Sequence, residues 1–193
     1  MTEETPENDF DPEEWRERLQ SHRAEKDEFF ADHPQSPVPP EERDDFESLD
    51  YFDPDTDYRV TATVEVHDQP EPVEMDVSAG PPQRYLRVAT LRFELGEGDD
   101  TDSYDLAGYR QQEDDDGLFV PFRDKTTGQQ TYRDGRYMEF ETEELTDGAE
   151  MVLDFNLAYS PFCAYSETFA CPLAPEENWL DAEIRAGEQF DQR

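Results

Sequence analysis

The sequence predicts a mainly β protein, in which an antiparallel sheet curls into a barrel or sandwich and an N-terminal α-helix packs on it. Apolar residues recur at helical spacing over residues 11–33, but from residue 57 onward they alternate with polar residues, which is typical of half-buried strands. Turn signals separate the alternating segments, with no helical pattern between them, as in antiparallel sheets. The 193 residues suit a single domain, which we place at residues 11–193 behind an acidic, disordered tail at residues 1–10.

The helix is predicted over residues 11–33. Asp11 is a favourable N-cap and Pro12 suits the first helical position, because a side-chain oxygen satisfies the free amides there and proline has none to satisfy. Trp15, Leu19 and Phe30 share one side of this helix. Pro34 ends it, and residues 34–56 are predicted to form a proline-rich linker followed by a short helix.

The β-rich body is predicted to span residues 57–193. The alternation of apolar and polar residues continues through most of this region, with turn signals such as Asp134-Gly135 and Asp147-Gly148 between segments. The expected strands are residues 58–66, 73–77, 84–95, 104–109, 118–122, 136–140 and 151–156.

Charge narrows the classes of partner. The chain has 52 acidic and 16 basic residues, a net charge of −36, so phosphate backbones and anionic membrane surfaces would repel it. Its 13 Phe, 9 Tyr and 2 Trp residues argue against disorder. Acid-rich, lysine-poor composition fits the salty cytoplasm of a halophilic archaeon, where the Debye length is about 3 Å. We find no secretion signal and no long apolar span, and therefore expect a cytoplasmic protein that binds neither nucleic acid nor membrane.

Three stretches depart from this acidity: residues 77–93, 117–138 and 155–166. Within the first, Arg87 lies among apolar residues of a strand, so we expect it to form a structural ion pair. The second carries a local positive charge, and the third follows directly after Asp154. We therefore expect the Asp154 carboxylate to lie within hydrogen-bond distance of Arg123 or Arg136. Beside an open cavity this pair would orient a ligand, whereas a sealed pair would be structural.

Cys163 and Cys171 are the only cysteines. Neither forms a Cys-x-x-Cys motif, and all three histidines lie far upstream, so we expect no metal site and no cofactor. A structural role is predicted for both residues, either as buried thiols or as a bridge across a tight loop.

Several motifs resemble the domain-of-unknown-function 1684 family over residues 15–190. The resemblance rests on Pro121-Phe122-Arg123-Asp124, Thr126-Thr127-Gly128, Gly135-Arg136-Tyr137, Asp154 to Tyr159, Cys163-Ala164-Tyr165, Cys171-Pro172-Leu173 and Glu177-Asn178. It implies no activity, but it places Asn178 and the polar residues named above in family motifs.

Our leading hypothesis is a binding module for a small polar or anionic metabolite, held in a pocket lined by Arg, Tyr and Asn. The residues expected to bind the ligand are Arg123, Asp124, Thr127, Tyr132, Arg136, Asp154, Asn156, Tyr159 and Asn178. One alternative is a hydrolase-like enzyme with Asp154 or Asp124 as general base. Another is a structural or interaction protein whose motif residues form internal polar networks. The sequence leaves the oligomeric state open.

Overall fold

A computed structural model describes residues 10–142 and 145–191 of the chain. Residues 1–9 of the predicted tail lie outside the described residues. Residue 10 belongs to the folded part, because the Phe10 ring packs edge-on against Trp15 and lies 4.2 Å beneath the guanidinium of Arg59. In the described residues, no helix has the length and apolar character needed to cross a membrane.

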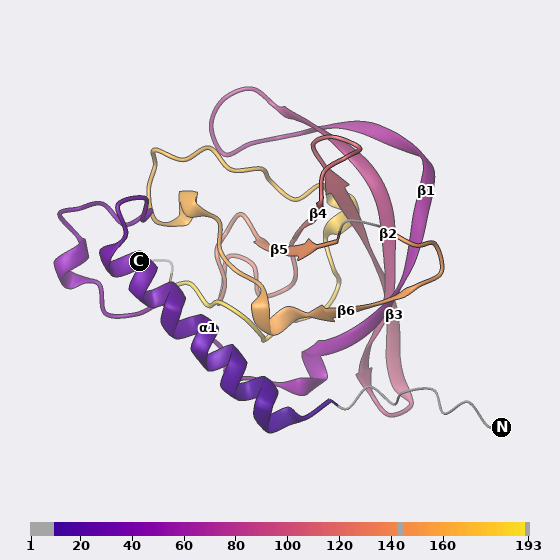
Figure 1. Ribbon diagram of the computed structural model, residues 1–193, viewed down its shortest axis with the longest axis horizontal. Coiled ribbons are helices and arrows are strands. Elements are labelled where there is room, and N and C mark those ends of the chain that lie inside the picture. Colours follow the sequence, from indigo (N-terminus) through magenta and orange to yellow (C-terminus); the bar gives the residue numbers. More distant parts are fainter. Residues whose placement is uncertain (1–9, 143–144, 192–193) are drawn as a thin grey trace.

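The predicted helix forms as α1, Pro12–Asp32. The Asp11 side chain accepts hydrogen bonds from the amides of Glu13 (2.8 Å) and Glu14 (3.3 Å), which is the capping that the sequence indicates. The buried residues of the helix are Trp15, Leu19 and Phe30. In Figure 1, α1 runs along one side of the molecule while β1, β2 and β3 form the opposite wall.

One six-stranded antiparallel sheet confirms the predicted fold class. Its strands are β1 (Arg59–Met75), β2 (Gln83–Glu97), β3 (Asp100–Arg110), β4 (Gly117–Phe122), β5 (Arg136–Glu141) and β6 (Glu150–Asp154), in the order β5-β4-β3-β2-β1-β6. The sheet curls into a half-barrel rather than a sandwich (Figure 1). Two strands were expected within β1, but its pairing with β2 continues across a register shift between Val66 and Glu71, so a bulge replaces the expected break.

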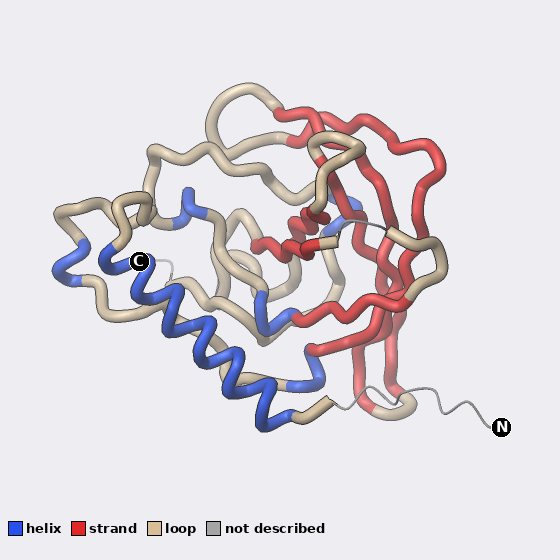
Figure 2. The backbone as a smooth tube through the Cα atoms, in the orientation of Figure 1, coloured by secondary structure: helices blue, strands red, loops and turns tan. Residues whose placement is uncertain are grey.

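The β-rich body is shorter than expected. After β6 the described chain has no named strand and consists of loops and the single-turn 3₁₀ helices η3 (Phe155–Leu157), η4 (Phe162–Ala164) and η5 (Glu176–Asn178), seen as the tan and short blue segments in Figure 2. The expected short helix near residue 45 is likewise one 3₁₀ turn, η1 (Arg43–Asp45). Tyr159 forms a bridge with Tyr137 at the free edge of β5, with N–O distances of 2.8 and 3.0 Å, so this segment extends the half-barrel.

The main core lies between the concave face of the sheet and the chain that follows β6. Buried side chains from all six strands meet Phe155, Ile184 and Ala186 there, and these three residues have no exposed surface. A smaller cluster of Phe30, Val38 and Leu49 joins α1 to the linker. Burial of the apolar surface in both clusters supplies the main driving force for folding. The smaller cluster also holds α1 against the open side of the half-barrel.

Candidate functional site

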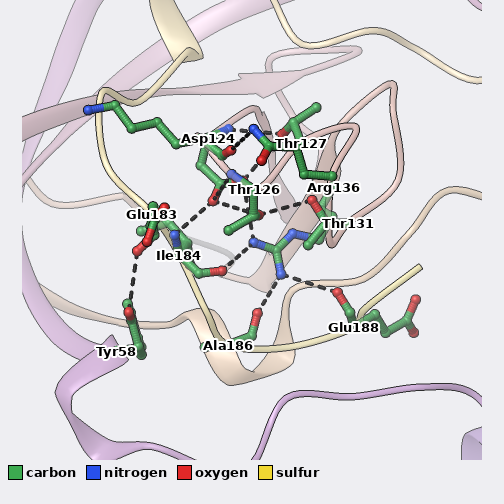
Figure 3. A network of polar contacts seen from close by, with 12 residues as sticks. Tyr58, Asp124, Thr126, Thr127, Thr131, Arg136, Glu183, Ile184, Ala186 and Glu188 are labelled. Atoms are coloured by element: carbon green, nitrogen blue, oxygen red, sulfur yellow. Dashed lines mark hydrogen bonds and ion pairs between the residues drawn. The ribbon is translucent and has the colours of Figure 1, made fainter. Parts of the chain in front are cut away.

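The Asp124–Arg136 pair lies at the centre of a sealed polar network (Figure 3). The Asp124 Oδ1 and Arg136 Nη2 atoms are 3.5 Å apart, and the two side chains are 0% and 1% exposed. Asp124 also accepts hydrogen bonds from the hydroxyl of Thr126 (2.8 Å) and the amide of Ile184 (2.7 Å). Each carboxylate oxygen is therefore occupied by the protein itself.

The Arg136 guanidinium binds the C-terminal chain as well. It donates to the carbonyls of Ile184 (2.8 Å), Glu188 (3.3 Å) and Ala186. Burial lowers the pKa of Arg136, and the charge of Asp124 opposes that shift. These contacts fasten residues 184–188 to β5, which favours a structural role for the pair over contact with a ligand.

Asn178 forms a second buried connection. Its amide donates to the carbonyls of Ala107 (2.9 Å) and Pro121 (2.8 Å), and its oxygen accepts from the Ala107 amide (2.7 Å). Asn178 has no exposed surface. The hydrogen bonds of its side-chain amide go to strands β3 and β4, so Asn178 joins η5 to the sheet.

Three other expected site residues also have protein partners. The Arg123 guanidinium lies 5.1 Å from the Trp179 ring centroid and 3.7 Å from Asp134. Thr127 accepts a hydrogen bond from the Asp124 amide at 3.1 Å. The Tyr132 hydroxyl donates to the sulfur of Cys163 at 3.8 Å. The structure thus brings Asp124, Thr127 and Arg136 together and leaves Tyr132 in a separate cluster.

The expected contact between Asp154 and Arg123 or Arg136 was wrong. The Asp154 carboxylate instead accepts hydrogen bonds from the indole nitrogen of Trp15 (2.7 Å) and the side-chain nitrogen of Asn156 (2.9 Å). Arg136 pairs with Asp124 and Arg123 with Asp134. Both arginines and their carboxylate partners lie within residues 117–138. Strand β6, which carries Asp154, lies at the other edge of the sheet. Asp154 therefore anchors the start of α1.

Two of the expected residues, Asp154 and Tyr159, line cavities. One cavity of about 1000 Å³ is lined by side chains from α1, β2–β5 and the chain after β6. A second of about 630 Å³ lies beside it under α1, between β5 and β6. Both cavities are lined by His22, Glu139, Phe140, Leu157, Tyr159 and Phe162. They are adjacent compartments of one groove, which we call the tyrosine groove.

A row of aromatic rings forms one wall of the larger compartment. Tyr85 stacks on Phe119 with centroids 5.7 Å apart, Phe119 meets Tyr137 edge-on at 4.7 Å, and Tyr137 meets Tyr159 edge-on at 5.8 Å. Burial raises the pKa of both Tyr137 and Tyr159, and the Glu139 carboxylate raises that of Tyr159 further. The hydroxyls are therefore neutral and the ring faces remain electron-rich.

The charges along the larger compartment are mostly negative. Its ionisable lining residues other than tyrosines and Cys171 are His22, Arg110, Asp115, Glu139 and Glu141. The Arg110 guanidinium is occupied by the carbonyls of Gly117 (2.8 Å) and Thr142 (2.9 Å). This leaves carboxylates and aromatic faces as the main features that a ligand would meet. Among the described residues, no group of three or more His, Cys, Asp or Glu side chains could hold a metal ion.

Residues 44–189 match the family described as "Protein of unknown function (DUF1684)". The chain belongs to the DUF1684 family. It is also similar to an uncharacterised protein of Haloarcula marismortui whose structure was solved by solution NMR, with 59% identity, coverage of 93% of this chain and 96% of that chain, and a TM-score of 0.73. No curated protein matches.

Most residues of the tyrosine groove were not identified as site residues from this DUF1684 sequence. Its walls include Tyr85, Phe119, Tyr137 and Leu157. The low acidity of their sequence segments was the one indication common to these residues. Each of these residues lies in one of the three stretches that depart from the general acidity, residues 77–93, 117–138 and 155–166. Arg87, from the first stretch, pairs with Glu177 at 3.1 Å.

Proposed function

We propose that this protein is a binding module for a small organic cation, which the tyrosine groove receives through its aromatic wall. The observation that carries the proposal is the cavity of about 1000 Å³ with a continuous row of four rings along one side. Small-molecule sites typically enclose about 300–1000 Å³ and are lined by apolar and aromatic side chains with a few polar groups.

Charge favours a cation over the small polar or anionic ligand expected from the sequence. Glu139 and Glu141 face the larger compartment, while its arginine is already bound to backbone carbonyls. An aromatic face attracts a cation that lies within about 6 Å of the ring centroid. The groove contains one such contact already, because the Lys26 ammonium lies 4.6 Å from the centroid of the Tyr159 ring.

The contacts of the two carboxylates support binding rather than the hydrolase alternative. Asp124 is sealed, and Asp154 is occupied by Trp15 and Asn156. A general base must reach the proton that it abstracts, and both oxygens of each carboxylate already accept hydrogen bonds from the protein. The sealed network instead supports a structural role for most family-motif residues, with the ligand site beside them.

The proposal is tested by calorimetric titration in multimolar KCl with choline as the probe. Its neutral isostere 3,3-dimethylbutan-1-ol serves as the control ligand. We expect saturable binding of choline and at least tenfold weaker binding of the isostere, because only choline interacts with the ring faces as a cation. Equal binding of the two would refute the cation, and no binding of either would refute the site.

A pair of variants locates the binding. Leu157 lies at the junction of the two compartments and is 46% exposed, so a larger side chain fits there without disturbing the core. Leu157→Trp is expected to fill the junction and abolish choline binding, whereas the matched Leu157→Ala leaves the groove open and binds as before. Unchanged binding by Leu157→Trp would place the site elsewhere.

A further inference from the structure

The two cysteines lie together at one end of the tyrosine groove. The Cys163 backbone amide donates to the Cys171 sulfur at 3.4 Å, and the Tyr132 hydroxyl donates to the Cys163 sulfur at 3.8 Å. Both thiols are free. Cys163 is half-buried, while Cys171 is 8% exposed and lines the larger compartment. The sequence predicts either buried thiols or a bridge across a tight loop, and the structure places the two residues as neighbours with free thiols.

Their surroundings give the two sulfurs different roles. The neighbouring Cys171 thiol lowers the pKa of Cys163, with help from the hydroxyls of Tyr132 and Ser78. Burial and the charge of Asp134 oppose this shift. The contact with Cys163 and burial raise the pKa of Cys171. The opposite shifts favour the thiolate at Cys163 and the thiol at Cys171, and the thiolate is the nucleophilic form.

We propose that Cys163 and Cys171 form a reversible dithiol–disulfide site, in which Cys163 reacts with hydrogen peroxide and Cys171 resolves the product. Cys163 is the more exposed of the two residues and would meet the oxidant, while the buried Cys171 lies next to it. The reaction of the two thiols needs no ligand in the groove, so it is independent of the proposed function.

The chemistry balances within this pair. The Cys163 thiolate attacks one peroxide oxygen, the O–O bond breaks, and a sulfenic acid and hydroxide form. The Cys171 sulfur then attacks the Cys163 sulfur, and the S–O bond breaks as the S–S bond forms. The proton from Cys171 leaves with the departing hydroxide as water. Overall, two thiols and one peroxide give one disulfide and two waters, and an added dithiol reverses the change.

The disulfide would close the loop of residues 164–170 covalently. Phe169 of this loop lines the cavity and packs edge-on against Phe162, with centroids 5.3 Å apart. Phe162 directly precedes Cys163. Oxidation would therefore fix one wall of the groove in place.

The test treats the reduced, full-length protein with one equivalent of hydrogen peroxide in multimolar KCl at pH 7, without denaturant. We expect intact mass to fall by two hydrogens, both titratable thiols to disappear, and dithiothreitol to restore them. Cys171→Ala is expected to stop at a sulfenic acid that dimedone traps, while Cys163→Ala stays reduced. Two free thiols in the treated wild type would overturn the proposal, irrespective of the results for the two variants.

The rate of alkylation by iodoacetamide provides a second readout on the wild type. We expect Cys163 to react first, with a pH midpoint below that of an ordinary thiol, and the midpoint to rise in Cys171→Ala because that variant lacks the neighbouring thiol. Equal labelling of both cysteines with the midpoint of an ordinary thiol, about 8.5, would also overturn the assignment.

Discussion

Removal of the buried Asp124 carboxylate tests the structural role of the sealed network. In Asp124→Ala, the Arg136 guanidinium keeps its charge with 1% exposure and loses its only carboxylate within 4.0 Å among the described residues. Breaking one partner of a buried pair costs about 3–5 kcal/mol. The donors of Thr126 and Ile184 lose their acceptor at the same time. We therefore expect the free energy of unfolding to fall by about 4 kcal/mol or more.

The assay is urea and thermal unfolding, followed by circular dichroism in multimolar KCl. For a domain of this size, about 4 kcal/mol corresponds to a Tm lower by roughly 8–16 °C. Asp181→Asn is the matched control, because Asp181 pairs with Lys125 at 2.8 Å with 90% of its side chain exposed, and such pairs contribute about 0–1 kcal/mol. A loss below about 1 kcal/mol in Asp124→Ala would refute the structural reading.

Three further predictions concern the fold. Dialysis from multimolar to millimolar KCl should abolish cooperative unfolding, since 52 acidic residues then repel without screening; an unchanged far-UV spectrum and Tm would contradict this. Trp15→Phe loses the 2.7 Å hydrogen bond to Asp154 and should cost about 1.5–3 kcal/mol, measured by urea unfolding; a loss below about 0.5 kcal/mol would show that the bond does not hold α1. Asn178→Ala should accelerate hydrogen exchange at the Ala107 amide, which it bonds at 2.7 Å; unchanged exchange there would contradict the joining role.

The elements that could be predicted are those with strong local signals. Asp11 and Pro12 marked the start of α1, and alternation marked all six strands. The chain from residue 155 onward could not be assigned in the same way. Its loops are held by distant partners, such as Arg136 for residues 184–188 and Asn178 for β3 and β4. Local periodicity carries no information about such contacts.

The candidate site could likewise be predicted only where a local sequence signal exists. The sequence identified Asp124, Arg136 and Asn178 as unusual polar residues, but burial decides between a sealed connection and a ligand site, and burial depends on the tertiary fold. The groove joins Tyr85, Tyr137 and Tyr159 from three separate segments with His22 of α1. The sequence named Tyr159 as a site residue and placed Tyr137 in a family motif, whereas only the departure from acidity indicated the segment of Tyr85.

The central claim is that the aromatic wall of the tyrosine groove receives a cationic ligand. Intermolecular nuclear Overhauser effects between choline methyl protons and the protein's ring protons test it most directly, in isotope-labelled protein at multimolar KCl. We expect contacts to the rings of Tyr137 and Tyr159, and we expect Leu157→Trp to abolish them. Contacts confined to the exposed Trp179 ring, which is 50% exposed and outside the groove lining, would contradict it.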